Sequence, residues 1–136
     1  MNEKLSRRKA LKGIGSAGVV ALLDARSLSA QEAAIRIAGQ PVEIVVAPVS
    51  AVTVRLSVTP IVNGQSQPLP HDGSLARRSW SPPAARITSL TRARHVRCGD
   101  LVVKFTPDPL IIRVEAKDGR LVQQLRPDPQ TGALER

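Results

Sequence analysis

The chain has 136 residues, of which 42% are hydrophobic and 23% charged, which fits one globular domain and is too short for a two-domain enzyme. Trp80 and Phe105 are the only aromatic residues, so stacking platforms for nucleic-acid bases or sugars have almost nothing to be built from. The single cysteine, Cys98, excludes an intramolecular disulfide and a cysteine-rich zinc site. Of the net charge of +9, residues 1–29 contribute six basic and two acidic side chains, and the remainder carries the +5 of an ordinary small domain.

The first 30 residues have the layout of a secretory signal peptide. A basic start is followed by an apolar run over residues 13–23, which is too short to span a bilayer as a helix. Arg7 and Arg8, followed by a Leu-Lys pair, resemble the twin-arginine export motif of bacteria, with Ala10 where that motif usually has Phe. The sequence therefore predicts a signal peptide over residues 1–30, a periplasmic or secreted protein, and no stable membrane span.

Three glycines in this segment invite two other interpretations. An N-terminal amphipathic helix is disfavoured, because Gly13, Gly15 and Gly18 would each cost it about 1 kcal/mol. The same glycines spell G-x-G-x-x-G, but a dinucleotide-binding loop follows a buried strand, and only a basic segment precedes these residues. No cofactor is predicted.

From residue 35 onward the apolar residues follow the period of β-strands. The clearest alternation places Val52, Val54, Leu56 and Val58 on one face of a strand and polar residues on the other. Strands are expected over residues 42–46, 52–59, 94–98, 101–106, 110–116 and 121–126, with Pro41 and Pro48 bounding the first. Such short strands without helices predict an all-β domain, most simply an antiparallel β-sandwich.

Two short motifs predict the turns between these strands. Asp118-Gly119 lies between two alternating runs and predicts a hairpin with a type I′ turn. Gly99-Asp100 gives a weaker turn signal for the pair before it. Residues 63–85 are rich in proline and glycine without periodicity, which indicates a long surface loop or a boundary.

The acidic residues do not suggest catalysis by a pair of carboxylates, which glycosidases require about 5 to 10 Å apart. Glu43 and Glu115 are expected on the solvated polar faces of strands. Each aspartate of the body neighbours Gly or Pro and is expected to cap a turn: Asp72, Asp100, Asp108, Asp118 and Asp128.

The histidines and the cysteine also lack the pattern of a reactive site. His95 and Cys98 are three residues apart on a strand, so their side chains point to opposite faces and cannot bind one metal ion together. Cys98 is expected to be a small buried residue, and His71 has nothing nearby to activate it. The sequence predicts no catalytic, cofactor-binding or metal-binding residue.

A run of arginines and the tryptophan each leave two interpretations open. The arginines could form a surface for anions or nucleic acid, but the missing aromatics and the lack of a groove-entering helix favour ordinary solvated side chains and no nucleic-acid partner. Trp80 is either a sugar platform or, as we expect, a plug that closes the loop onto the core. The run comprises Arg77, Arg78, Arg86, Arg92, Arg94 and Arg97.

The C-terminal half resembles a known family. Residues 99–114, GDLVVKFTPDPLIIRV, followed by DGRLVQQL at 118–125, resemble the N-terminal β-sandwich of glycoside hydrolase family 31, the α-glucosidase and α-xylosidase family. Residues 42–56 would correspond to that domain's early strands. In that family the sandwich packs against a (β/α)8 barrel that carries the catalytic aspartates, and none of that barrel is present in this sequence.

The resemblance implies a noncatalytic domain over residues 34–136, with a galactose-mutarotase-like sandwich that is incomplete. It implies a truncated product or fragment of an exported enzyme, whose partners are the missing catalytic barrel and carbohydrate. A chain that holds only part of a sandwich is expected to leave an apolar face and unpaired strand edges open to water. The alternative is a self-standing exported β-sandwich that binds a partner or a glycan.

Overall fold

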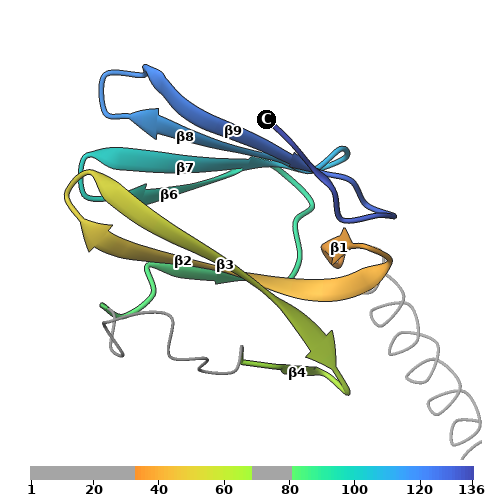
Figure 1. The fold of residues 1–136 in the computed structure, drawn as a ribbon. Coiled ribbons are helices and arrows are strands. Elements are labelled where there is room, and N and C mark those ends of the chain that lie inside the picture. Colours follow the sequence, from red (N-terminus) through yellow and green to blue (C-terminus); the bar gives the residue numbers. More distant parts are fainter. Residues whose placement is uncertain (1–32, 69–80) are drawn as a thin grey trace, which may run out of the picture. The chain divides into compact units, whose positions relative to one another are not determined.

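The computed structural model describes residues 33–68 and 81–136 (Figure 1). The expected signal peptide, with Arg7 and Arg8, lies outside these residues. By its internal contacts the chain divides into the units Met1–Ala33 and Ala34–Arg136, and both sheets belong to the second. In the described residues every regular element is a β-strand and every strand pair is antiparallel, so the prediction of an antiparallel all-β domain is confirmed.

The first sheet is built around its two long strands, β2 and β3. Its strand order is β1-β2-β3-β4, and β5 also pairs with β2. The bounds are β1 Arg36–Ile37, β2 Gln40–Ser50, β3 Thr53–Val62, β4 Gln65–Ser66 and β5 Ala85–Ile87.

The second sheet is a meander in which each strand pairs with its neighbour in the chain. The bounds are β6 Arg94–Cys98, β7 Leu101–Thr106, β8 Ile111–Ala116, β9 Leu121–Pro127 and β10 Leu134–Glu135. The four long strands match the alternating runs of the sequence to within a residue. In β6, β7 and β8, apolar residues at every second position are buried in the core, such as Val96 and Cys98.

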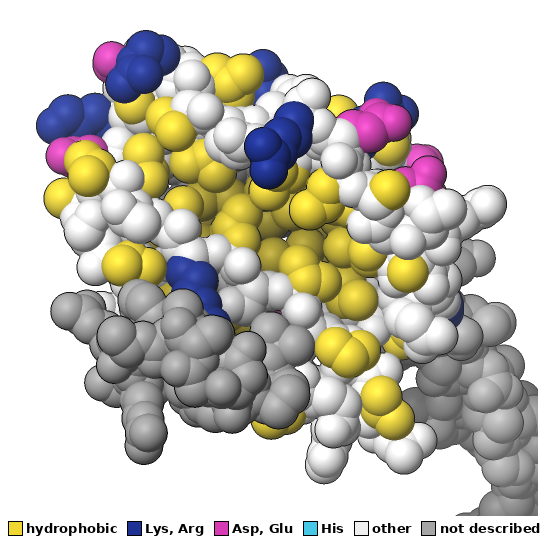
Figure 2. All heavy atoms as spheres, in the orientation of Figure 1, with side chains coloured by type: hydrophobic (Ala, Val, Ile, Leu, Met, Phe, Trp, Pro, Cys, Tyr) yellow, Lys and Arg dark blue, Asp and Glu magenta, His cyan; other side chains and the backbone are white. Residues whose placement is uncertain are grey.

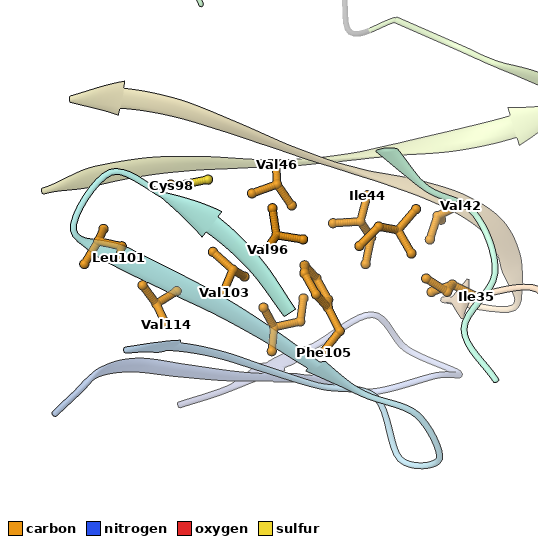
Figure 3. Packing of buried hydrophobic residues seen from close by; sticks show 12 residues of the cluster. Ile35, Val42, Ile44, Val46, Val96, Cys98, Leu101, Val103, Phe105 and Val114 are labelled. Atoms are coloured by element: carbon orange, nitrogen blue, oxygen red, sulfur yellow. The ribbon is translucent and has the colours of Figure 1, made fainter. Parts of the chain in front are cut away.

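The two sheets lie face to face and share one core (Figures 1 and 3). Phe105, at the middle of this core, is completely buried between the sheets. Because few other side chains are large, small aliphatic residues fill the space around it. Besides Phe105, the buried residues of the core are Ile35, Val42, Ile44, Val46 and Ile87 from the first sheet and its approach, and Val96, Cys98, Leu101, Val103, Ile112 and Val114 from the second.

The prolines do not bound the first predicted strand, so that expectation is wrong. Strand β2 runs through both Pro41 and Pro48. Pro41 is the second residue of the strand, and Pro48 stands directly before a register shift against β3. A proline is tolerated at both kinds of place, since a strand's first residues and a bulge need no regular ladder hydrogen bond from it.

The hairpin predicted at Asp118-Gly119 is confirmed, but the prediction of a type I′ turn is wrong. Of these two residues only Gly119 has a positive φ, at 86°, whereas a type I′ turn needs positive values at both. The Gly119 amide donates to the Ala116 carbonyl at 2.8 Å, and the Ala116 amide donates to the Arg120 carbonyl at 2.9 Å. This is a longer hairpin loop that closes with glycine in the left-handed region.

Backbone hydrogen bonds join the two sheets at opposite ends of the sandwich. At one end the Asp100 amide, in the β6–β7 turn, donates to the Ala51 carbonyl, in the β2–β3 turn, at 2.7 Å. At the other end the Gly39 amide donates to the Pro129 carbonyl at 2.8 Å. Gly99 permits the first contact, because a Cβ on it would lie 2.6 Å from the Ala51 carbonyl oxygen.

Replacing Gly99 by alanine should therefore cost more than the backbone strain alone. Gly99 and Gly64 both have positive φ, at 61° and 77°, but a Cβ on Gly64 would meet nothing within 4 Å. We expect Gly64→Ala to lower the free energy of unfolding by about 1 kcal/mol and Gly99→Ala to lower it by more than about 2 kcal/mol. Urea unfolding of both variants measures the difference, and equal losses would contradict the close approach of the two turns.

Candidate functional site

A trough lies on the outer face of the first sheet, on the side away from the core. It has a volume of about 500 Å³. Strands β2 and β3 form its floor, since every second residue of each strand points away from the core. The described residues that line this first-sheet trough are Glu43, Val45, Ala47, Arg55, Ser57, Thr59, Ser66, Pro68, Ser81, Pro83 and Arg86.

An ion pair marks the wall of the trough. The Arg86 guanidinium donates to the Glu43 carboxylate at 3.1 Å. Strand β5 pairs Arg86 with Val45, which places Arg86 diagonally across from Glu43. The Glu43 side chain is only 9% exposed, whereas that of Arg86 is 60% exposed. The expectation that Glu43 is solvated is therefore wrong, because strand pairing covers the carboxylate and supplies its counterion.

Two hydroxyls extend the polar surface from this ion pair. Thr59 pairs directly with Glu43 in the sheet, and its Oγ1 donates to the Glu43 carbonyl at 3.5 Å. The same Oγ1 lies 2.7 Å from Ser66 Oγ, with either hydroxyl able to donate. The arrangement offers hydroxyl and guanidinium groups for hydrogen bonds to a polar molecule. Its described lining contains one carboxylate, so it does not hold the opposed pair that hydrolysis of a glycoside requires.

The second buried carboxylate lies on the opposite side of the sandwich. Glu115 faces outward from β8 and forms an ion pair with Lys104 of β7, at 2.6 Å. The expectation of a solvated Glu115 is also wrong, since the residue is 9% exposed. The hydrogen bond from Lys104 lowers the pKa of Glu115, and the positive charges of Arg113 and His95 lower it further. Glu43 and Glu115 stand on the outer faces of different sheets and cannot act on one substrate.

The described aspartates behave largely as turn residues. The Asp118 carboxylate accepts the Arg120 amide at 3.0 Å. The Asp128 carboxylate accepts the amides of Thr131 and Gln130, and these bonds lower the Asp128 pKa. Asp100 is also in a turn and accepts from Lys117 Nζ at 3.3 Å.

Asp108 and Asp72 are the other two aspartates that the sequence assigns to turns. Asp108 has a positive φ of 43° in the turn before Pro109, where a short polar side chain is tolerated. Asp72 lies outside the described residues.

The predictions for His95 and Cys98 are confirmed. His95 is exposed on the outer face of β6, and Cys98 is 2% exposed in the core beside Val96. Burial raises the pKa of the Cys98 thiol, which keeps it protonated and unreactive. In the part of the chain that the structure describes, no cluster of three His, Cys, Asp or Glu residues is arranged to hold a metal ion.

The described arginines of the run have different surroundings. Arg86 belongs to the ion pair of the trough, and Arg92, Arg94 and Arg97 are exposed, as expected of solvated side chains. Four other singled-out residues lie outside the described residues: His71, Arg77, Arg78 and Trp80.

The chain matches no protein-family model, no curated protein and no solved structure. Within residues 33–68 and 81–136, no helix is long and apolar enough to cross a membrane.

Removing Arg86 should destabilise the sandwich, because the covered Glu43 carboxylate loses the guanidinium that forms an ion pair with it. We expect Arg86→Ala to lower the free energy of unfolding by about 1 to 2 kcal/mol. Lys117→Ala is the matched control, since its pair with Asp100 is exposed on both sides and should contribute almost nothing. Adding Glu43→Gln to Arg86→Ala should recover part of the loss. Urea unfolding that shows equal effects for both single variants would contradict this account.

The pH dependence of stability should report on Glu115. Its pKa is lower in the folded chain, so the pair with Lys104 stabilises the fold above pH 4.5, the ordinary pKa of a glutamate, and this contribution is lost as the pH falls through the folded value. Glu115→Gln should therefore have a lower melting temperature at pH 7 than the unchanged protein. Its melting temperature should also fall by less when the pH is lowered from 7 to 3. Glu135→Gln, whose side chain is 74% exposed, should keep the full pH dependence. Melting curves of the unchanged protein, Glu115→Gln and Glu135→Gln, each recorded at a series of pH values, test this.

Proposed function

We propose that residues 34–136 form the noncatalytic N-terminal domain of an exported family 31 glycoside hydrolase. The domain is an incomplete galactose-mutarotase-like sandwich that supports a catalytic barrel and the binding of carbohydrate. The support is the agreement between the resemblance and the strands: the stretch that resembles the family is the β7–β8–β9 meander with both of its hairpins. An open apolar groove also lies between the sheets, with Val54 and Leu56 of β3 on one side and Val122 and Leu125 of β9 on the other. An incomplete sandwich is expected to present such a groove.

The noncatalytic role follows from the placement of the carboxylates. The two buried acids, Glu43 and Glu115, are held in ion pairs on opposite faces of the sandwich, and Asp118 and Asp128 accept backbone amides within turns, which supports a structural role for these carboxylates. Carbohydrate would meet this domain through the hydroxyls and the ion pair of the first-sheet trough, without a stacking platform among its described residues.

The same trough favours a second candidate, a self-standing exported β-sandwich that binds a partner or a glycan. Translation of the DNA downstream of Arg136 in all three frames separates the two. An in-frame or frameshifted catalytic barrel supports the hydrolase domain, and a stop followed by an unrelated gene supports the binding module.

In either case the purified chain should not turn over a chromogenic α-glucoside, and activity that stays with the protein through several columns would overturn the noncatalytic role.

Export should depend on the arginine pair at the N-terminus. Twin-arginine receptors read Arg7 and Arg8 as a unit, so replacing both by lysine keeps the charge but removes the motif. We expect the double variant to stay in the cytoplasm, whereas replacing Lys4 by arginine should leave export unchanged. Cell fractionation measures both, and equal periplasmic recovery of the double variant would remove the twin-arginine route.

A further inference from the structure

A row of hydrogen-bond donors crosses the outer face of the second sheet. Four neighbouring strands each contribute one residue to this donor row, and each residue pairs directly with the next: His95 of β6, Lys104 of β7, Arg113 of β8 and Gln124 of β9. Val96 and Val114, which stand beside the row in β6 and β8, are buried in the core, so the row itself points outward. The apolar hollow in Figure 2 is the groove between the sheets, and the donor row lies on a different surface.

The donor row places basic side chains side by side. Lys104 lies between His95 and Arg113, and like charges directly opposite each other destabilise a pair of strands. Glu115, on the same face, offsets part of this charge, because it forms an ion pair with Lys104. Arg113, and Arg97 farther along β6, form no ion pair within the described part of the chain. The face therefore keeps an excess of positive charge that a bound anion would neutralise.

The arrangement of the donor row suits a linear polymer. Neighbouring strands of a sheet are about 4.8 Å apart, so the four side chains start at about that interval along a line across the strands. All four can donate to a carboxylate or hydroxyl oxygen, and the guanidinium of Arg113 can hold a carboxylate with two parallel hydrogen bonds. A small anion would engage one or two of these donors. A polymer with an acidic group on each repeating unit would engage them in turn.

Nucleic acids and anionic membranes fit this face less well. Phe105 is the one aromatic residue among those that the structure describes, and it is completely buried, so it offers no base a surface for stacking. Basic clusters that bind anionic lipids hold about four to eight Lys and Arg residues, whereas the donor row and Arg97 together supply three. A sugar polymer offers oxygen atoms to Gln124 as well as acidic groups to the basic side chains.

We propose that the outer face of the second sheet binds an acidic polysaccharide, a chain of sugars with carboxylates, which lies across the strands along the donor row. This inference does not rest on the proposed function, because the donor row and the first-sheet trough belong to different sheets.

Polygalacturonate, in which each sugar carries a carboxylate, is the probe for the full chain, and titration calorimetry measures its binding. The methyl-esterified form of the same polymer, which lacks these charges, should bind at least about fivefold more weakly. No binding of polygalacturonate, or equal binding of both forms, would overturn the proposal. A single-stranded oligonucleotide or anionic phospholipid vesicles that bind more tightly than polygalacturonate would overturn it as well.

Two matched variants locate the binding. Arg113→Gln removes a charge from the donor row, and Arg36→Gln removes one from β1 of the first sheet, where the exposed Arg36 guanidinium donates to the Gly39 carbonyl. Arg113→Gln should weaken the binding of polygalacturonate about fivefold, and Arg36→Gln should leave it unchanged. Both arginines are exposed, and a cooperative melting curve confirms that each variant folds. Equal weakening by both variants would mean that the net charge of +9 alone attracts the polymer, and would overturn the proposal.

Discussion

Two backbone hydrogen bonds fix how the two sheets meet at the ends of the sandwich. Asp100 N to Ala51 O and Gly39 N to Pro129 O each join a turn of one sheet to a loop of the other. Such bonds form only where the backbones come very close, which is why Gly99 has no room for a Cβ against Ala51. The core between the ends is made of small aliphatic residues around Phe105, so it adds packing without directional contacts.

The end contacts also explain why the molecule has an open side. They fix the spacing of the sheets at the hairpin turns and at the opposite end, whereas on the long outer edges of β3 and β9 the described strand pairs, with β4 and β10, are each two residues long. The side chains of Val54 and Leu56 pack against the core and remain only partly buried, while Val52 is exposed. The groove lies between the sheets on this side, with Val54 and Leu56 of β3 opposite Val122 and Leu125 of β9.

The sequence predicted the second sheet well and the first sheet less well, for a physical reason. In β6 to β8 apolar residues at every second position face the core, so the strand bounds could be derived locally. In β2 the prolines sit at positions where the ladder does not need their N–H, and only the pairing with β1 and β3 shows this. The burial of Glu43 depends on Arg86, 43 residues away, and the groove depends on how two sheets meet. No local pattern carries either signal.

Strand β3 contributes side chains to two surfaces, the first-sheet trough and the apolar groove between the sheets. Its odd-numbered residues Arg55, Ser57 and Thr59 line the first-sheet trough, and Val54 and Leu56 line the groove. Because successive side chains of one strand point to opposite faces, any shift of β3 moves both surfaces together. On its outer edge β3 pairs with β4 at Ile61 and Val62, and over the rest of its length the strand is held by β2 and by the packing of Val54 and Leu56 against the core.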